Sequence, residues 1–215
     1  MGNNEIKMKI KTALISLSDK RKLKPLLNVL KKNKIKIIST GGTFKEIKKL
    51  KFNCIEVSKF TNSPEILEGR VKTLHPKIHA GILNKRDNKL HLKDLRVNNF
   101  ENIDLVIVNF YPFENTINNT TNHSKIIENI DVGGPTMVRS AAKNYKDVTV
   151  ITSSEQYSEL IEELNKFKGS TSLNFRQKLS RIAFTETAYY DSIISDYFNK
   201  VTNTNFPEKK CYMEI

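Results

Sequence analysis

Features of secreted and membrane proteins are scarce in this sequence. Its 215 residues include two cysteines, Cys54 and Cys211, which lie far apart and in no spacing typical of a metal site. No segment approaches the roughly 18 uninterrupted apolar residues of a membrane-spanning helix. The amino terminus lacks the apolar stretch of a signal peptide, and Ile6 stands where a myristoylation signal has Ser or Thr. We therefore expect a cytoplasmic protein with reduced thiols and no structural disulfide.

Internal repeats and low-complexity linkers are also lacking before about Asn199. A chain with 38% apolar and 27% charged residues can bury one core of ordinary size. We predict one domain over residues 11–198, preceded by a flexible extension at 1–10. Residues 199–215 would be a linker or the start of a further domain.

Acidic residues are outnumbered, with 23 Asp and Glu against 36 Lys and Arg and a formal net charge of +13. Lysines crowd residues 31–51, which raises the hypothesis of nucleic-acid binding. Only Phe44 and Phe52 interleave with them, and a composition rich in Lys, Asn and Ile is enough to explain the charge. We favour a solvated face and expect no nucleic-acid or membrane partner, with polyanion binding as the alternative. The positive electrostatic field of these lysines would also attract a phosphorylated small substrate.

Short apolar runs alternate with amphipathic ones along the chain. This alternation predicts an α/β protein with three layers, in which helices cover both faces of a mostly parallel, twisted sheet. The run Leu105-Val106-Ile107-Val108 is continuously apolar, so we expect a central strand at residues 104–110 that is buried on both faces. Further strands are predicted at residues 12–17, 36–39, 53–57 and 147–152, and helices at 23–30, 44–50, 135–144, 154–167 and 173–198.

Small polar residues follow three of these strands. Ligands of open parallel sheets bind outside the carboxyl ends of the strands, so these residues should line one crevice. The paired glycines Gly41 and Gly42 would let backbone N–H groups approach an anion at the start of the next helix. With Ser18, Lys20 and Arg70 they form a candidate monophosphate site, and an ordinary turn is the alternative. The residues at the three strand ends are Ser16, Ser18, Ser39, Thr40, Thr43, Asn109 and Tyr111.

A dense set of cations and hydrogen-bonding side chains lies between Gly69 and Gly81. We expect a structured functional loop there, because Pro76 removes a backbone donor and disfavours helix at the preceding residue. His75 and His79 are spaced as in half a zinc motif, yet no third ligand follows and the proline interrupts the helix that such spacing needs. We therefore predict no metal, and an exposed basic loop without a ligand is the alternative. The set comprises Arg70, Lys72, Thr73, His75 and His79.

Polar side chains also recur on one face of the helix predicted after Gly134. Two cations four residues apart on that face repel each other, and Asp131 just before the helix is a candidate partner for them. A surface ion pair with a favourable helix-dipole contribution is the alternative. The face comprises Thr136, Arg139, Ser140 and Lys143.

Four sequence blocks resemble one known family. They are R-V-K-T-L-H-P followed by H-A-G-I-L within residues 70–83, S-T-G-G-T at 39–43, N-F-Y-P-F at 109–113, and D-V-G-G at 131–134 with residues 139–144. The blocks resemble the IMP cyclohydrolase domain, the amino-terminal half of bifunctional purine-biosynthesis proteins whose other half is AICAR transformylase. The resemblance runs from about Lys11 to about Pro207 and implies a methylglyoxal synthase-like fold. It also implies the dehydrating ring closure of 5-formamidoimidazole-4-carboxamide ribonucleotide (FAICAR) to IMP.

The resemblance assigns roles to individual residues. Lys72 and Tyr111 would orient the carboxamide and stabilise the oxyanion, and Asp131 and Lys143 would move protons as a coupled pair. It implies no cofactor and no metal, a purine nucleotide as the small-molecule substrate, and a homodimer. The substrate-binding residues would be Ser16, Ser18, Asp19, Lys20, Ser39, Thr40, Gly41, Gly42, Thr43, Arg70, Val71, Thr73, Asn109, Val132, Gly133 and Gly134.

One pair of residues departs from the family pattern. Members usually follow Ser-Asp-Lys with Thr-Gly, whereas this chain has Arg21 and Lys22, so the resemblance does not fix the geometry of the loop beside the phosphate, where Arg21 could displace or assist Lys20. The chain ends near a point that resembles the linker into the transformylase half, and we expect it not to transfer formyl groups from folate. The main alternative is a non-catalytic nucleotide- or phosphate-binding regulatory domain. The joint presence of the four residues assigned to catalysis argues against that alternative.

Overall fold

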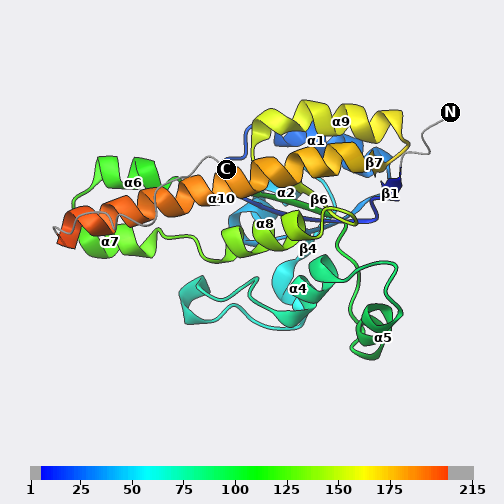
Figure 1. Ribbon diagram of the computed structural model, residues 1–215, viewed down its shortest axis with the longest axis horizontal. Helices are drawn as coiled ribbons and strands as arrows, with labels where there is room; N and C mark the ends of the chain where they lie inside the picture. The colour runs from blue at the N-terminus through cyan, green and yellow to red at the C-terminus, as the bar shows by residue number, and fades with distance from the viewer. Residues whose placement is uncertain (1–5, 203–215) are drawn as a thin grey trace, which may run out of the picture.

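A five-stranded parallel sheet forms the centre of the computed structural model, which describes residues 6–202 (Figure 1). Its strand order is β4-β3-β2-β5-β6, and Leu14 of β2 pairs with both Ile38 of β3 and Val106 of β5. A separate antiparallel pair consists of β1 (Lys7–Lys9) and β7 (Ser170–Ser172). The sheet strands are β2 (Thr12–Leu17), β3 (Lys36–Ser39), β4 (Ile55–Glu56), β5 (Leu105–Asn109) and β6 (Thr149–Ile151).

Helices cover both faces of the sheet, which confirms the predicted three layers. On one side α1 packs with α9, and on the other α8 packs with α4 and α10 (Figure 1). The helices are α1 (Leu23–Lys32), α2 (Gly41–Lys49), α3 (Val57–Thr61), α4 (Pro76–Leu83), α5 (Lys89–Val97), α6 (Phe113–Asn119), α7 (His123–Glu128), α8 (Gly133–Lys143), α9 (Tyr157–Lys166) and α10 (Leu173–Thr202), with short 3₁₀ segments η1 (Leu67–Gly69) and η2 (Ser154–Gln156). None of the described helices is long and apolar enough to cross a membrane.

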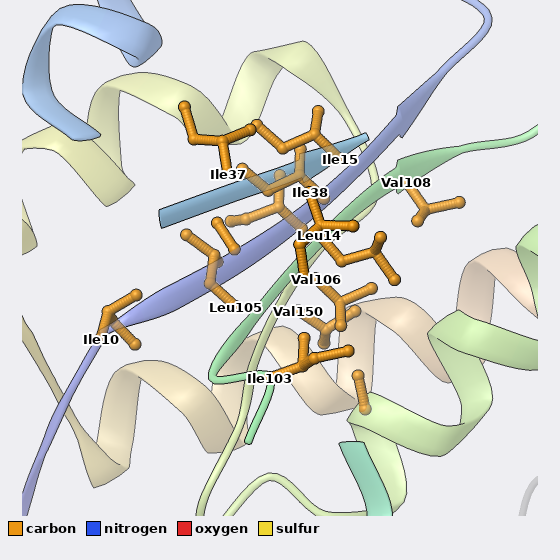
Figure 2. Packing of buried hydrophobic residues seen from close by; sticks show 14 of the residues in the cluster. Ile10, Leu14, Ile15, Ile37, Ile38, Ile103, Leu105, Val106, Val108 and Val150 are labelled. Carbon is orange, nitrogen blue, oxygen red and sulfur yellow. The ribbon is translucent and has the colours of Figure 1, made fainter. Parts of the chain in front are cut away.

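The core lies between the central strands and the helices that flank them (Figure 2). Residues 105–108 of β5 are each at most 1% exposed, so the prediction of a strand buried on both faces is confirmed. α1 buries four leucines at positions 23, 26, 27 and 30, a spacing that puts one apolar stripe against the sheet. This rigid core fixes where the strand ends lie, and the candidate site is built on those ends.

Several predicted elements differ in the structure. Pro76 does not interrupt a helix but begins α4, because proline suits the first helical position, where its missing N–H is not needed. His75 caps this helix by accepting a hydrogen bond at Nδ1 from the backbone N–H of Lys77 at 3.1 Å. The loop predicted between Gly69 and Gly81 therefore ends at His75, and the expectation that Pro76 interrupts a helix between His75 and His79 is wrong. β4 is also shorter than predicted, since α3 starts at Val57.

The last helix continues beyond its predicted end at residue 198. α10 runs to Thr202, and Figure 1 shows it projecting past the sheet alongside α6 and α7. Phe113 and Tyr190 anchor this projecting part in a small second core. Cys211, most of the predicted linker and residues 1–5 lie outside the described part of the chain.

Candidate active site

The crevice lies where the chain reverses its direction through the sheet. β2 is followed by β3 and β4 on one side, whereas its other neighbour β5 is followed by β6 on the opposite side. Such a switch point leaves a gap outside the carboxyl ends of the two adjacent strands. Leu17 and Asn109 are paired at these ends, which brings the predicted polar residues of β2, β3 and β5 to one edge of the sheet.

Hydroxyl groups tie the glycine turn to the end of β2. Ser16 Oγ lies 2.7 Å from Thr40 Oγ1, and Ser39 Oγ donates to the carbonyl of Ile15 at 2.8 Å. The hydroxyl of Thr43 accepts from the N–H of Leu17 at 2.8 Å and lies 3.0 Å from its carbonyl oxygen. The side chain of Thr40 makes no capping hydrogen bond, so the first N–H groups of α2 are left for another acceptor.

Two ammonium groups converge on this turn. A Cβ built on Gly41 would lie 3.5 Å from Nζ of Lys72, and one built on Gly42 would lie 4.0 Å from Nζ of Lys20. Nζ of Lys72 also pairs with Oε2 of Glu65 at 3.0 Å. The start of α2 therefore combines open N–H groups, glycine backbone and two cations, as a site for a phosphate monoester requires.

Arg70 does not join this cluster in the structure. Its guanidinium pairs with Glu128 of α7, with Nε donating to Oε1 at 3.1 Å, and the Arg70 side chain is 64% exposed. The hydrogen bond to Glu128 raises the pKa of Arg70, and the same contact lowers the pKa of Glu128. Sequence spacing could not predict this ion pair, because Arg70 and Glu128 come from segments far apart in the chain.

Asn109 organises the loop that follows β2. Its Oδ1 accepts from the backbone N–H groups of Ser18 and Asp19 at 2.7 and 3.1 Å and lies 2.8 Å from Ser18 Oγ. Its Nδ2 donates to the carbonyl of Asp19 at 2.9 Å. The amide thereby holds the loop that carries Lys20, so Asn109 shapes the crevice through the backbone of this loop.

Arg21 and Lys22, the two residues that depart from the family pattern, continue the same loop. The guanidinium of Arg21 pairs with the Asp19 carboxylate at 2.7 Å, and this contact holds the pKa of Asp19 below its usual value. Lys22 adopts a left-handed backbone with φ of 56°, the conformation that the glycine usual in the family would adopt without strain. Its ammonium pairs with Glu155 at 2.9 Å, which fastens the loop to η2, just before α9.

A cavity of about 430 Å³ opens beside this loop, at the ends of β2, β5 and β6. It includes the predicted residues Ser18, Asp19 and Asn109 and none of those in the glycine turn. The segment after β6 was missing from the predicted site, although polar residues after an apolar run are the same signal that identified the other strand ends. The remaining lining residues are Arg21, Phe110, Pro112, Asn115, Thr152, Ser153 and Ser154.

Asp131 is held at the start of α8. Burial raises the pKa of its carboxyl group, and backbone N–H groups of Gly134 and Tyr111 act in the opposite direction. The N–H of Gly134 donates to Oδ1 at 2.8 Å, and a side chain at position 134 would overlap the carboxylate. The N–H of Asp131 donates in turn to the hydroxyl of Tyr190 at 2.8 Å.

Lys72 and Thr73 connect the two halves of the site. A Cβ built on Gly133 would lie 2.7 Å from Oγ1 of Thr73, while the preceding Lys72 reaches Gly41. Two consecutive residues thus contact the starts of α2 and α8, and Val71 before them is half-buried. The flanking residues Tyr111 and Val132 are 54% and 58% exposed, respectively.

Lys143 lies at the far end of α8 from Asp131. The 11 residues of this helix, at about 1.5 Å each, extend roughly 16 Å. One chain therefore does not hold Asp131 and Lys143 as the coupled pair that the sequence analysis expected. Arg139 was also expected near Asp131, but its guanidinium lies over the ring of Phe184 at 5.7 Å. Ser140 turns inward, donating to the carbonyl of Thr136 at 2.8 Å.

Comparison with known proteins identifies the family. Residues 22–136, more than half of the chain, match the model of the MGS-like domain. The chain belongs to the MGS-like domain family. Residues 141–214 match a second model, the AICARFT/IMPCHase bienzyme, so the resemblance and the fold class inferred from the sequence are both confirmed.

Curated relatives of this MGS-like chain are longer proteins. The bifunctional purine biosynthesis protein PurH of Prochlorococcus marinus (strain AS9601) is 50% identical over 189 residues, which are 87% of this chain and 36% of the relative. PurH of Clostridioides difficile (strain 630) is 47% identical over 198 residues, 92% of this chain and 38% of the relative. The chain thus spans little more than a third of these relatives. The solved structure of ForH covers 88% of this chain and 99% of its own, with a TM-score of 0.78 and 28% identity.

Proposed function

We propose that this chain is an IMP cyclohydrolase, which closes the ring of FAICAR with loss of water to form IMP. The observation that carries the proposal is that Lys72 reaches the cationic glycine turn and Thr73 reaches the start of α8, which holds the partly buried carboxylate of Asp131. Identity near 50% with proteins named bifunctional PurH supports the same reaction. Purine biosynthesis and the reduced cysteines expected from the sequence also support a cytoplasmic location.

The reaction sets three demands on such a site. The carboxamide nitrogen attacks the formyl carbon of the same molecule, so the reacting groups are already close together. An amide nitrogen is nevertheless a poor nucleophile, and the formyl oxygen gains negative charge before it leaves as water. The site must therefore offer a proton acceptor, a cation or donor at the oxyanion, and a donor for the departing oxygen.

Asp131 is the proposed proton acceptor. Burial raises the pKa of its carboxyl group, and a carboxylate with a raised pKa binds a proton more tightly during the attack. The N–H of Gly134, which donates to the carboxylate, and the hydroxyl of Tyr190, which accepts from the backbone N–H of Asp131, would keep the carboxylate in place. Tyr111 lies at the same edge, and we assign it to the carboxamide of the substrate.

The glycine turn and Lys20 are the proposed phosphate site. Lys72 lies between this turn and the start of α8, so its ammonium would leave Glu65 and stabilise the oxyanion when substrate binds. The alternative is that Lys72 binds the phosphate, because its ammonium already lies near Gly41. The two roles predict different kinetic effects of Lys72→Ala. Loss of the oxyanion contact lowers kcat, whereas loss of a phosphate contact raises KM.

We further propose that the active form is a homodimer and that Lys143 serves the crevice of a second copy. The support is the length of α8, which separates Lys143 from Asp131 within one chain. Mixing Asp131→Asn and Lys143→Ala chains should restore about a quarter of wild-type activity, because half of the random dimers are mixed and each carries one intact site. A mixture no more active than its components would place both residues in the same copy.

Ring closure by the purified chain, followed through ultraviolet absorbance, tests the activity. We expect FAICAR to be consumed with saturation kinetics and IMP to accumulate in equal amount. A regulatory domain that only binds nucleotides is the alternative. It would bind IMP, as measured by calorimetry, without raising the rate above the uncatalysed reaction, and that result would refute the proposal.

A further inference from the structure

A second cavity lies at the opposite end of the sheet from the candidate active site. Its volume is about 730 Å³, and residues at the starts of β2, β3 and β5 line it together with residues of α5. The six residues of β2, at about 3.3 Å each, put roughly 20 Å between this end of the sheet and the crevice. A substrate in the crevice would therefore not reach it.

Two of the cations that line this cavity are compensated by carboxylates. Lys36 pairs with Glu101 at 2.7 Å, and Arg86 lies 3.5 Å from Asp104. Asp104 also accepts hydrogen bonds from the backbone at the start of β2. These groups belong to the framework of the cavity, and their charges cancel.

Three further cations of the lining, Lys9, Lys11 and Arg96, have no ion-pair partner within residues 6–202. The ammonium of Lys9 donates to the carbonyl of Lys168, which leaves its positive charge uncompensated. Cations gathered around a concave surface focus the field and concentrate anions there. The excess basic charge of the chain is thus gathered in part at a cavity that the cyclohydrolase reaction does not use.

Part of the cavity wall is apolar. Phe100 lies there with Leu92 and Leu95, which are 36% and 8% exposed, and its ring contacts no other aromatic ring of the described chain. An aromatic and aliphatic wall beside a few charged side chains is the composition of a small-molecule site. A flat base can stack on such a ring.

We propose that this cavity binds a nucleoside polyphosphate. The phosphates would contact the three uncompensated cations, and the base would stack on Phe100. Inorganic phosphate is a less suitable ligand, because it would make no contact with the apolar wall of the cavity. A nucleic acid would need an extended basic groove, whereas these cations surround one concavity. The proposal stands independently of the cyclohydrolase activity.

Calorimetric titration of the chain with ATP tests where the ligand binds. The double substitution Lys11→Glu with Arg96→Glu should weaken binding by about tenfold or more, because it replaces two attractive charges with repulsive ones. The matched control is Lys24→Glu with Lys146→Glu, two exposed lysines outside the cavity that give the same change in net charge. The control should bind ATP as the wild type does, and equal weakening in both variants would refute the site.

A second comparison tests the base. Phe100→Ala should weaken ATP binding by about fivefold or more through lost stacking, and should leave the affinity for inorganic tripolyphosphate unchanged. Tripolyphosphate binding as tightly as ATP, tighter binding of a single-stranded oligonucleotide, or no binding of ATP at all would each overturn the proposal. Thermal unfolding of each variant checks its fold. Lys11→Gln with Arg96→Gln replaces the double Glu variant if that one does not fold.

Discussion

Replacing Tyr190 with phenylalanine removes the hydroxyl that accepts a hydrogen bond from the backbone N–H of Asp131 at 2.8 Å. Tyr190 is 6% exposed and packs against Phe110 with ring centroids 5.0 Å apart, so the ring should stay in place. Loss of the acceptor leaves a half-buried N–H unsatisfied, which costs about 1–3 kcal/mol. At about 2–4 °C per kcal/mol for a chain of this size, Tm should fall by several degrees.

The same change should also act on catalysis. The carboxylate of Asp131 is positioned through its backbone, and small misplacements of a reacting group can cost up to about 10²-fold in rate. We expect kcat of Tyr190→Phe to fall by about tenfold or more with little change in KM. Burial raises the pKa of Tyr190 to about 12, so its hydroxyl is neutral throughout a pH profile between 5 and 9 and does not itself titrate there.

Tyr189→Phe is the matched control for this prediction. Its hydroxyl donates to Glu114 at 3.1 Å on an exposed surface, so its loss should cost about 0.5 kcal/mol or less and leave kcat unchanged. Equal loss of kcat in the two variants would show that the Tyr190 hydroxyl has no specific effect on Asp131. A Tyr190→Phe enzyme with lowered Tm and unchanged kcat would contradict the positioning of Asp131 through Tyr190.

Three further predictions concern the loop, the carboxylate and the cations. Lys22→Gly should raise the free energy of unfolding by about 0.5–1 kcal/mol in chemical denaturation, because glycine adopts the left-handed backbone without strain. A lower free energy of unfolding would mean that the lost ion pair to Glu155 outweighs the relieved strain. Asp131→Asn should be at least as stable as the wild type at pH 7 in chemical denaturation. Burial raises the pKa of the Asp131 carboxyl group in the folded state above 3.8, so ionisation of this group lowers the stability of the wild type as pH rises past that value. The advantage of the variant should therefore vanish below about pH 4, where the carboxyl group is protonated in both states. Lys20→Ala should raise KM whereas Lys72→Ala should lower kcat in steady-state kinetics, and a change in KM alone for both would move Lys72 to the phosphate.

The central strands and the crevice were predictable because their signals are local. A continuous apolar run such as residues 105–108 indicates a strand buried on both faces, and parallel strands end at the same edge of a sheet. The polar residues after those strands could therefore be placed together without knowledge of the tertiary structure. The same argument, applied to the polar residues after β6, would have added Thr152 and Ser153 to the site.

Contacts between distant segments could not be predicted from spacing. The pairing of Arg70 with Glu128 and the hydrogen bond between Asp131 and Tyr190 join elements that only the folded chain brings together. The helix that begins at Pro76 was not predicted, because a proline interrupts a helix in its interior but is favoured at the first helical position. The separation of Asp131 from Lys143 could have been predicted, because the predicted helix between them is long enough to keep their side chains apart.

The turnover of FAICAR by Asp131→Asn, compared with the wild-type chain, tests the central claim most directly. Asparagine keeps the shape of the side chain and an acceptor for the N–H of Gly134 but cannot take up the proton. We predict that kcat falls by about 10²-fold or more while the chain stays folded and still binds IMP. An Asp131→Asn chain that closes the ring at the wild-type rate would contradict the assignment of this carboxylate as the base.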